Sequence, residues 1–218
     1  MNSDDWNVRY RDARVDSGSL WSATPPKIIR DTLATLSPGT ALDLATGDGR
    51  TAVWLAQQGW KTTGVDFSAE ALLTAQERAR RNNVDQIHWV CADARNWTPE
   101  TTFDVVIVAY LHLPRMENAE LLHRAAHWVA PGGTLIVLGH DVSNIAAGGH
   151  GPRNVDVLYS PELLRNNVQS TLTVARCEML HRNPTDDPES ADDTRLSVDT
   201  ILIAYSPLST ISSHSQPS

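Results

Sequence analysis

Two glycines and one acidic residue have types and spacing that indicate a binding site. Gly47 and Gly49 lie between an apolar run, residues 41–45, and a segment with helical apolar spacing, residues 49–58. Glycine has no Cβ, so such a loop lets a ligand approach the backbone closely, and the following helix offers free amide groups. Asp66 comes nineteen positions after Gly47, at the end of a second strand-like segment. A carboxylate there can accept hydrogen bonds from two ribose hydroxyls, so the pattern predicts a nucleotide-like ligand.

The glycine loop alone fits two kinds of ligand. The spacing Gly-x-Gly-x-x-Ala, from Gly47 to Ala52, suits a dinucleotide enzyme as well as other adenosyl cofactors. Asp43 favours the second kind, because a carboxylate inside the first strand is unfavourable beside a pyrophosphate but useful near a positive ligand. S-adenosylmethionine is such a ligand, since its sulfonium and ammonium outweigh its one carboxylate. The stretch Leu-Asp-Leu-Ala-Thr-Gly-Asp-Gly, residues 42–49, resembles the first motif of class I S-adenosylmethionine-dependent methyltransferases.

This resemblance implies a cofactor site spread over three strand ends. The methionine end would be held by Gly47, Gly49 and Arg50, with Asp43 near the ammonium, the ribose by Asp66, and the adenine by Asp93 and Ala94. We also expect cofactor contacts from Tyr10, Trp21, Phe67, Ala109 and Leu111. From the residues alone, Arg50 suits a surface position on the helix as well as a contact with the cofactor carboxylate.

Two histidines are candidate catalytic bases. His112 and His140 each follow a strand-like run, residues 103–110 and 134–139, at the edge where open α/β sheets place their ligands. A base is needed only for an acceptor that is protonated near pH 7, such as an alcohol or phenol, whereas a thiolate or an oxyanion attacks unaided. Asp141 could orient His140, although neighbours in a strand point to opposite sides. Either histidine also suits a hydrogen-bonded loop position, and no ligand motif of fixed spacing predicts a metal.

Alternating strand-like and helix-like segments predict an α/β fold. We expect a single-domain doubly wound Rossmann-like sheet, mostly parallel, and the resemblance implies seven strands with a C-terminal antiparallel strand. The strand-like runs 172–181 and 196–205 have no helix between them, so they predict an antiparallel pair. The expected organisation is a cap segment and helix over residues 1–40, a methyltransferase domain over 41–206 and a disordered tail over 207–218.

The N-terminal segment and one glycine-rich loop each allow two interpretations. The spacing Trp6-x-x-Arg9-Tyr10, followed by Leu20-Trp21, resembles the opening of small-molecule methyltransferases related to tellurite-resistance and thiopurine methyltransferases. Aromatic residues there could close over a cofactor, or they could pack a helix against the sheet edge. Residues 145–154 contain three glycines and suit either a lid or a plain surface loop.

Composition restricts the partners. The chain has 218 residues, 18 Lys plus Arg and 26 Asp plus Glu, and its net charge of -8 repels a phosphate backbone, so we expect no nucleic-acid partner. No apolar run has the length of a membrane span and residues 1–6 are polar, so we expect no membrane partner and a cytoplasmic location. Cys91 and Cys177 lie in apolar runs, and we expect both to be reduced core residues. A monomer or a homodimer is expected.

Three functional hypotheses remain. The favoured one is methyl transfer to a small-molecule acceptor, a thiol, chalcogen oxyanion, hydroxyl or amine. Enzymes that methylate DNA adenine or protein glutamine carry an Asn- or Asp-Pro-Pro-aromatic motif after the fourth strand, where this chain has Ala-Tyr-Leu-His-Leu-Pro, residues 109–114. The second is an NAD-dependent oxidoreductase, which leaves Asp43 and Asp93 unexplained and has no room for a substrate domain. The third is a non-catalytic adenosyl-ligand-binding protein.

Overall fold

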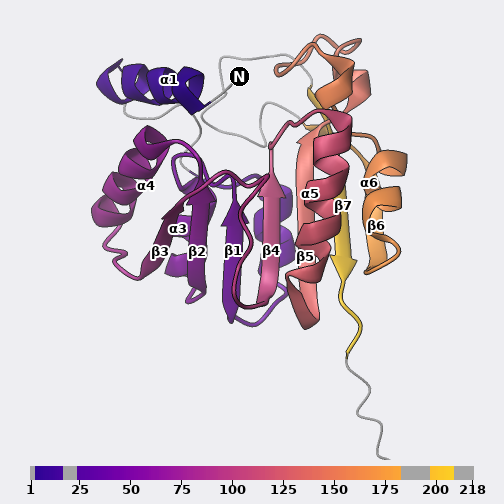
Figure 1. The fold of residues 1–218 in the computed structure, drawn as a ribbon, viewed down its shortest axis with the longest axis horizontal. Coiled ribbons are helices and arrows are strands. Elements are labelled where there is room, and N and C mark those ends of the chain that lie inside the picture. The colour runs from indigo at the N-terminus through magenta and orange to yellow at the C-terminus, as the bar shows by residue number, and fades with distance from the viewer. Residues whose placement is uncertain (1–2, 17–23, 183–196, 209–218) are drawn as a thin grey trace, which may run out of the picture.

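The computed structural model describes residues 3–16, 24–182 and 197–208, and they form a seven-stranded sheet with helices on both faces (Figure 1). The strands are β1 Thr40–Leu44, β2 Lys61–Asp66, β3 Ile87–Cys91, β4 Phe103–Ala109, β5 Val129–His140, β6 Thr173–Arg182 and β7 Ser197–Tyr205. The helices are α1 Ser3–Asp16, α2 Lys27–Leu33, α3 Arg50–Gln57, α4 Ala69–Arg81, α5 Arg115–His127 and α6 Pro161–Val168, with 3-10 turns η1 Val142–Asn144 and η2 Val155–Val157.

The strand order is β3-β2-β1-β4-β5-β7-β6. β1 to β5 are mutually parallel, whereas β7 runs antiparallel to both β5 and β6. The predicted fold class and the predicted antiparallel pair are therefore confirmed. The chain reverses its direction of winding between β1 and β4, and ligands of open α/β sheets bind at the carboxyl ends of the strands at such a point.

Two apolar layers hold the helices against the sheet. One face buries residues of α5 and α6, including Leu121, Leu122 and Leu164, and the other buries Ile29 of α2 and Leu55 of α3. β4 is an almost continuous run of buried aliphatic residues because it lies in the middle of the sheet and is covered on both faces. The polar positions at the strand ends are thereby held on a rigid framework.

Helix α1 lies at the end of the sheet where the parallel strands finish, next to α4 (Figure 1). Arg14 of α1 forms an ion pair of 2.7 Å with Glu70 at the start of α4. The side chain of Asn7 accepts a hydrogen bond of 2.7 Å from the hydroxyl of Ser68, and Ser68 in turn caps α4 by accepting from the amide of Ala71. Ser68 is therefore the N-cap of α4.

The expectation that both cysteines lie in the core is wrong. Cys91 is exposed and Cys177 is only partly buried, because β3 and β6 are the two edge strands of the sheet. Their apolar neighbours had indicated buried strands.

In the described part of the chain, no helix has both the length and the apolar character needed to cross a membrane.

Candidate functional site

The glycine loop between β1 and α3 has a backbone conformation that favours glycine. Gly47 and Gly49 have φ angles of 59° and 77°, in the left-handed region. A Cβ added to Gly49 would lie 2.7 Å from the Cβ of Ala75 and 2.9 Å from the ring of Trp89. The loop is therefore pressed against α4 and β3, and its shape depends on the absence of a side chain at this position.

Asp66 at the end of β2 ties this loop to the sheet. One carboxylate oxygen accepts a hydrogen bond of 2.9 Å from the amide of Gly47, and the other accepts one of 2.9 Å from the amide of Ser68. Burial raises the pKa of Asp66 above its usual range. The carboxylate predicted to bind a ribose thus also holds the glycine loop, and its ligand role remains a prediction.

Asp43 lies beneath the loop in a nearly water-free position, with 2% of its surface exposed. Burial raises its pKa to about 7, although a hydrogen bond from the hydroxyl of Thr46 and the charge of Arg50 act in the opposite direction. A buried carboxyl group in this state is stabilised in its ionised form by an added positive charge. The donor and acceptor set around the loop therefore fits a cationic ligand group.

Arg78 of α4 is a part of the site that the sequence reasoning missed. Its guanidinium forms an ion pair of 2.7 Å with the buried Asp48, and its Nε donates to the carbonyl oxygen of the same residue at 3.1 Å. As a cation near the end of α4, it is also expected from the helix dipole alone. Its partner lies thirty positions earlier, so no local pattern distinguishes it from Arg80 and Arg81.

Asp93, predicted to bind adenine, follows β3 and is paired with Arg95. Their closest atoms are 2.6 Å apart, and Arg95 also contacts Glu117 of α5 at 3.2 Å. The hydrogen bond from Arg95 holds the pKa of Asp93 below its usual range. Ala94, the next residue, is buried. The structure places both residues at the carboxyl edge, and their adenine role remains a prediction.

Tyr110, directly after β4, has a left-handed backbone with φ of 56°. Its phenol donates a hydrogen bond of 2.8 Å to Asp199 of β7, and burial raises its pKa above the usual value of 10. The guanidinium groups of Arg50 and Arg182 lie 5.7 and 5.8 Å from the centre of its ring. Arginine near an aromatic face is a stabilising arrangement. Tyr110 therefore joins the glycine-loop side of the site to the β6–β7 side.

Asp199 is the buried centre of the β6–β7 side. Besides Tyr110 it contacts Nδ1 of His140 at 3.0 Å and Nε of Arg182 at 3.2 Å. Burial acts to raise its pKa, but the hydrogen bond from His140 and the charge of Arg182 outweigh it, and the pKa lies below its usual range. Asp199 is therefore a carboxylate at neutral pH. The sequence analysis missed this residue.

The partner of His140 is Asp199, and the considered pairing with Asp141 does not occur. The β5–β7 register places His140 opposite Asp199, whereas Asp141 is buried and accepts a hydrogen bond of 2.6 Å from the hydroxyl of Thr200. The physical reason is the one expected from strand alternation, since neighbouring side chains point apart. The actual partner follows only from the register between β5 and β7, which are neighbours in the sheet but far apart in the sequence.

His112 is largely buried and stacks on His140, with ring centres 5.2 Å apart and planes inclined by 4°. Its Nδ1 lies 2.9 Å from the carbonyl oxygen of Val157, so this nitrogen carries the proton and donates it. Burial lowers its pKa to about 4, and the ring is neutral at physiological pH. The other edge of His140 lies against Gly151, where an added Cβ would meet the His140 ring at 2.4 Å. The structure thus brings the two predicted bases together, and their catalytic role remains a prediction.

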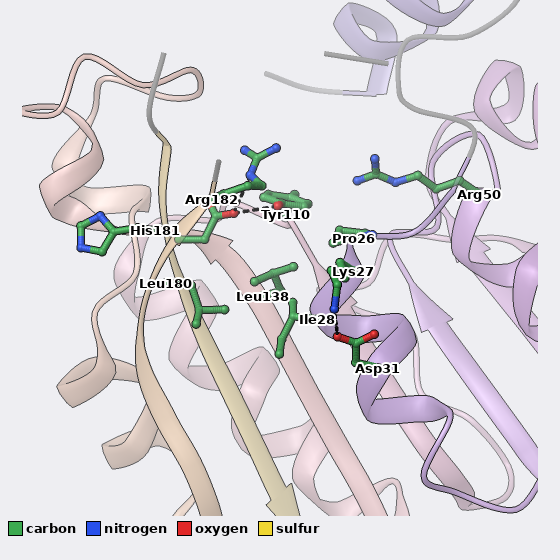
Figure 2. Close-up of a pocket in the computed structure, with 11 residues that line it drawn as sticks. Pro26, Lys27, Ile28, Asp31, Arg50, Tyr110, Leu138, Leu180, His181 and Arg182 are labelled. Carbon is green, nitrogen blue, oxygen red and sulfur yellow. Dashed lines mark hydrogen bonds and ion pairs between the residues drawn. The ribbon is translucent and has the colours of Figure 1, made fainter. Parts of the chain in front are cut away.

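A cavity of about 230 Å³ opens beside Tyr110 (Figure 2). Its wall combines cationic, acidic and aliphatic side chains from α2, α3, β5, β6 and β7. Its lining includes Lys27, Ile28, Arg50, Leu138, Leu180 and Arg182. Figure 2 shows the Arg50 and Arg182 side chains reaching toward Tyr110 from opposite sides. The sequence analysis did not place Arg182 or α2 at the site.

The remaining predicted cofactor contacts occupy varied positions. Tyr10 of α1 is buried, with its ring centre 5.8 Å from that of Trp6. Phe67 and Ala109 stand at the carboxyl ends of β2 and β4, and the carbonyl oxygen of Leu111 accepts from the Tyr159 hydroxyl. Trp21 lies outside the described residues. In the portion of the chain that the structure covers, no three His, Cys, Asp or Glu side chains are grouped so as to hold a metal ion.

The doubly wound sheet, the glycine loop at its switch point and the acidic residues at the ends of β1, β2 and β3 define the architecture of an adenosyl-cofactor enzyme. Residues 41–133 match a protein family described as a methyltransferase domain. Residues 41–133 therefore match a methyltransferase domain, and the sequence motif and the fold are those expected of the class I S-adenosylmethionine-dependent type.

Relatives and solved structures agree with this identification. Glycine N-methyltransferase of Rattus norvegicus is 28% identical over 150 residues, which cover 61% of this chain and 51% of the relative. Trans-aconitate 2-methyltransferase of Azoarcus sp. is 31% identical over 114 residues, covering 50% of this chain and 43% of the relative. The chain spans about half the length of these curated relatives. The N-methyltransferase NodS of Bradyrhizobium japonicum, solved with S-adenosyl-L-homocysteine, has the same fold, with a TM-score of 0.68, 16% identity and coverage of 94% of this chain and 100% of that chain.

Proposed function

We propose that this protein transfers a methyl group from S-adenosylmethionine to a small-molecule acceptor. The observation that carries the proposal is the buried carboxyl group of Asp43 under the glycine loop, with its pKa raised to about 7. A positive cofactor group near Asp43 relieves the unfavourable burial of its charge, whereas the pyrophosphate of NAD increases it. The NAD-dependent alternative is therefore disfavoured on electrostatic grounds.

The residues of the site have distinct expected tasks. When bound, S-adenosylmethionine supplies an electrophilic methyl group on its sulfonium. The loop from Gly47 to Arg50 would hold the methionine end, and Asp66 the ribose while it keeps the loop in shape. Tyr110 would form part of the wall between the cofactor and the cavity. Positioning of the acceptor and exclusion of water contribute much of the catalysis in such a displacement.

The acceptor is proposed to be small because the cavity beside Tyr110 is small, about 230 Å³. The two relatives described above are named for glycine and trans-aconitate, which are both small molecules. A basic side chain is not compelled by the geometry. His112 has a pKa of about 4 and is therefore a weak base. The ring of His140 lies against Gly151. An acceptor that attacks without losing a proton first suits this site.

Calorimetric titration with S-adenosylmethionine, S-adenosylhomocysteine and NAD tests the cofactor. We expect micromolar binding of the first two ligands and none of NAD, and the reverse result would favour the oxidoreductase. Asp66→Ala should weaken binding of S-adenosylhomocysteine by more than about 1 kcal/mol, because it removes a charged acceptor. Methyl transfer in an acceptor screen separates the enzyme from the non-catalytic binder.

A further inference from the structure

The cavity beside Tyr110 collects positive charge in an otherwise acidic protein. The chain has a net charge of -8, yet Lys27, Arg50 and Arg182 all line this cavity. Two acidic residues of the wall pair with two of these cations, since Asp31 is 2.5 Å from Lys27 and Asp199 is 3.2 Å from Arg182, and the wall keeps one positive charge in excess. An anionic ligand group is attracted to such a wall.

The two arginines stand on different sides of the Tyr110 ring. Arg50 is the first residue of α3, directly after Gly49, so it belongs to the glycine loop and the expected methionine end of the cofactor. Arg182 is the last residue of β6, and Nε of its side chain lies 3.2 Å from the buried Asp199. Figure 2 shows Arg182 and Arg50 separated by the Tyr110 side chain. Arg182 is therefore the guanidinium placed for a second ligand.

Aliphatic side chains complete the cavity below these charges. Ile28, Leu138 and Leu180 come from α2, β5 and β6 and lie on the side of Tyr110 away from the two guanidinium groups (Figure 2). A ligand that fits this wall has a charged head near Arg182 and a carbon skeleton against the aliphatic side chains. Apolar walls with a few placed polar groups are typical of small-molecule sites.

We propose that the methyl acceptor is a small carboxylic acid whose carboxylate is bound by Arg182. This inference rests on the proposed methyl transfer and specifies its substrate class. A planar guanidinium matches a carboxylate through two parallel hydrogen bonds. A phosphate dianion fits less well. The buried, ionised Asp199 lies against the same arginine and repels a ligand group with two negative charges more strongly than a carboxylate with one.

The test uses the full chain saturated with S-adenosylhomocysteine, so that binding is measured without turnover. The probes are matched acids and amides: butyrate and butyramide, benzoate and benzamide, phenylacetate and phenylacetamide. Dissociation constants are measured by ligand-observed NMR. We expect at least one acid to bind and its amide to bind at least tenfold more weakly.

Substitutions then assign the preference to one residue. Arg182→Gln should reduce the preference for the acid to less than threefold, and Arg182→Lys should retain part of it. Arg176→Gln is the matched control, because Arg176 lies on the same strand, has a partly exposed side chain and pairs with Glu178. The affinity for S-adenosylhomocysteine should stay within twofold in all three variants.

Three results would overturn the proposal: equal binding of acids and amides, no binding of either, or a preference that survives Arg182→Gln. Failure of the proposed function is distinguishable, since it shows as a chain that does not bind S-adenosylhomocysteine before any acid or amide is added.

Discussion

The phenol of Tyr110 is hydrogen-bonded to Asp199 at 2.8 Å, across 89 positions of the chain. One residue follows β4, which pairs with the first strand of the glycine-loop unit, and the other lies in β7. This bond therefore connects the expected cofactor side of the sheet with the side that carries Arg182. The same carboxylate contacts His140, so three side chains from three strand ends depend on one buried acceptor.

Tyr110→Phe tests this connection. The change removes the phenol donor and leaves Asp199 with fewer hydrogen bonds in a buried position, so the free energy of unfolding should fall by about 1–2 kcal/mol. Urea denaturation measures it. Tyr159→Phe is the control, because Tyr159 is also a hydrogen-bonded tyrosine but is more deeply buried and contacts Leu111 and Asn118. Both variants should lose stability, whereas only Tyr110→Phe should alter the KM of the acceptor. An equal effect of both on KM would contradict a specific role for Tyr110.

Asp43→Asn should stabilise the protein without cofactor and weaken cofactor binding. The pKa of Asp43 is raised from 3.8 to about 7, so the folded state holds a proton that the unfolded state releases, and this contribution is lost as pH rises from about 4 to 7. At pH 8 the variant should exceed the wild type by up to about 4 kcal/mol, with little difference near pH 4. Denaturant unfolding at the two pH values measures this, and calorimetry should give at least tenfold weaker binding of S-adenosylmethionine. Unchanged affinity would remove Asp43 from the cofactor site.

His112 should have the opposite pH dependence. Its pKa is lowered from 6.5 to about 4 by burial, so the folded state excludes a proton and loses stability as pH falls from about 6.5 to 4. The loss should reach about 3 kcal/mol at the acid end of this window. His112→Asn retains an amide donor for Val157 and should show a flatter dependence of unfolding free energy on pH. His123→Asn, at an exposed position of α5, should behave as the wild type. If both variants lose stability equally on acidification, His112 is not the responsible group.

Gly151→Ala should disturb the loop over His140. The residue has φ of 114° and a Cβ there would lie 2.4 Å from the His140 ring, so the loop must move. Gly148→Ala is a close control, because φ is 73° but no atom lies within 4 Å of the added Cβ. We expect turnover to fall at least tenfold for Gly151→Ala and much less for Gly148→Ala, with similar affinity for S-adenosylhomocysteine. Equal losses would show that backbone strain, and not the contact with His140, is responsible.

Much of the fold was predictable because its signals are local. Asp66 was predicted to end the second strand, as it does, and the predicted strand 196–205 matches β7 within one residue. The start of β5 was wrong. The strand begins at Val129 and continues through Pro-Gly-Gly, where hydrogen bonds between Gly132, Gly133 and Ser206 retain the pairing that a turn would have ended. Those bonds come from a distant segment, so no local pattern predicts them.

The candidate site was predictable only on the glycine-loop side. Asp43, Gly47 and Asp66 lie within one βαβ unit, where spacing in the sequence fixes spacing in the fold. Asp199 and Arg182 could not be predicted, because their positions depend on the register of β7 against β5 and β6. The predictable part of the site is therefore the expected cofactor side, and the unpredictable part is the proposed acceptor side.

The position of β7 also has a consequence for the order in which the protein is completed on the ribosome. β6 is synthesised before β7, yet β7 lies between β5 and β6 in the finished sheet. The first five strands can assemble while the chain is still growing, but β5 then presents an unpaired edge until β7 has emerged. The cavity beside Tyr110, which β6 and β7 help to line, is thus completed only after the glycine loop and the strands that carry it have been synthesised.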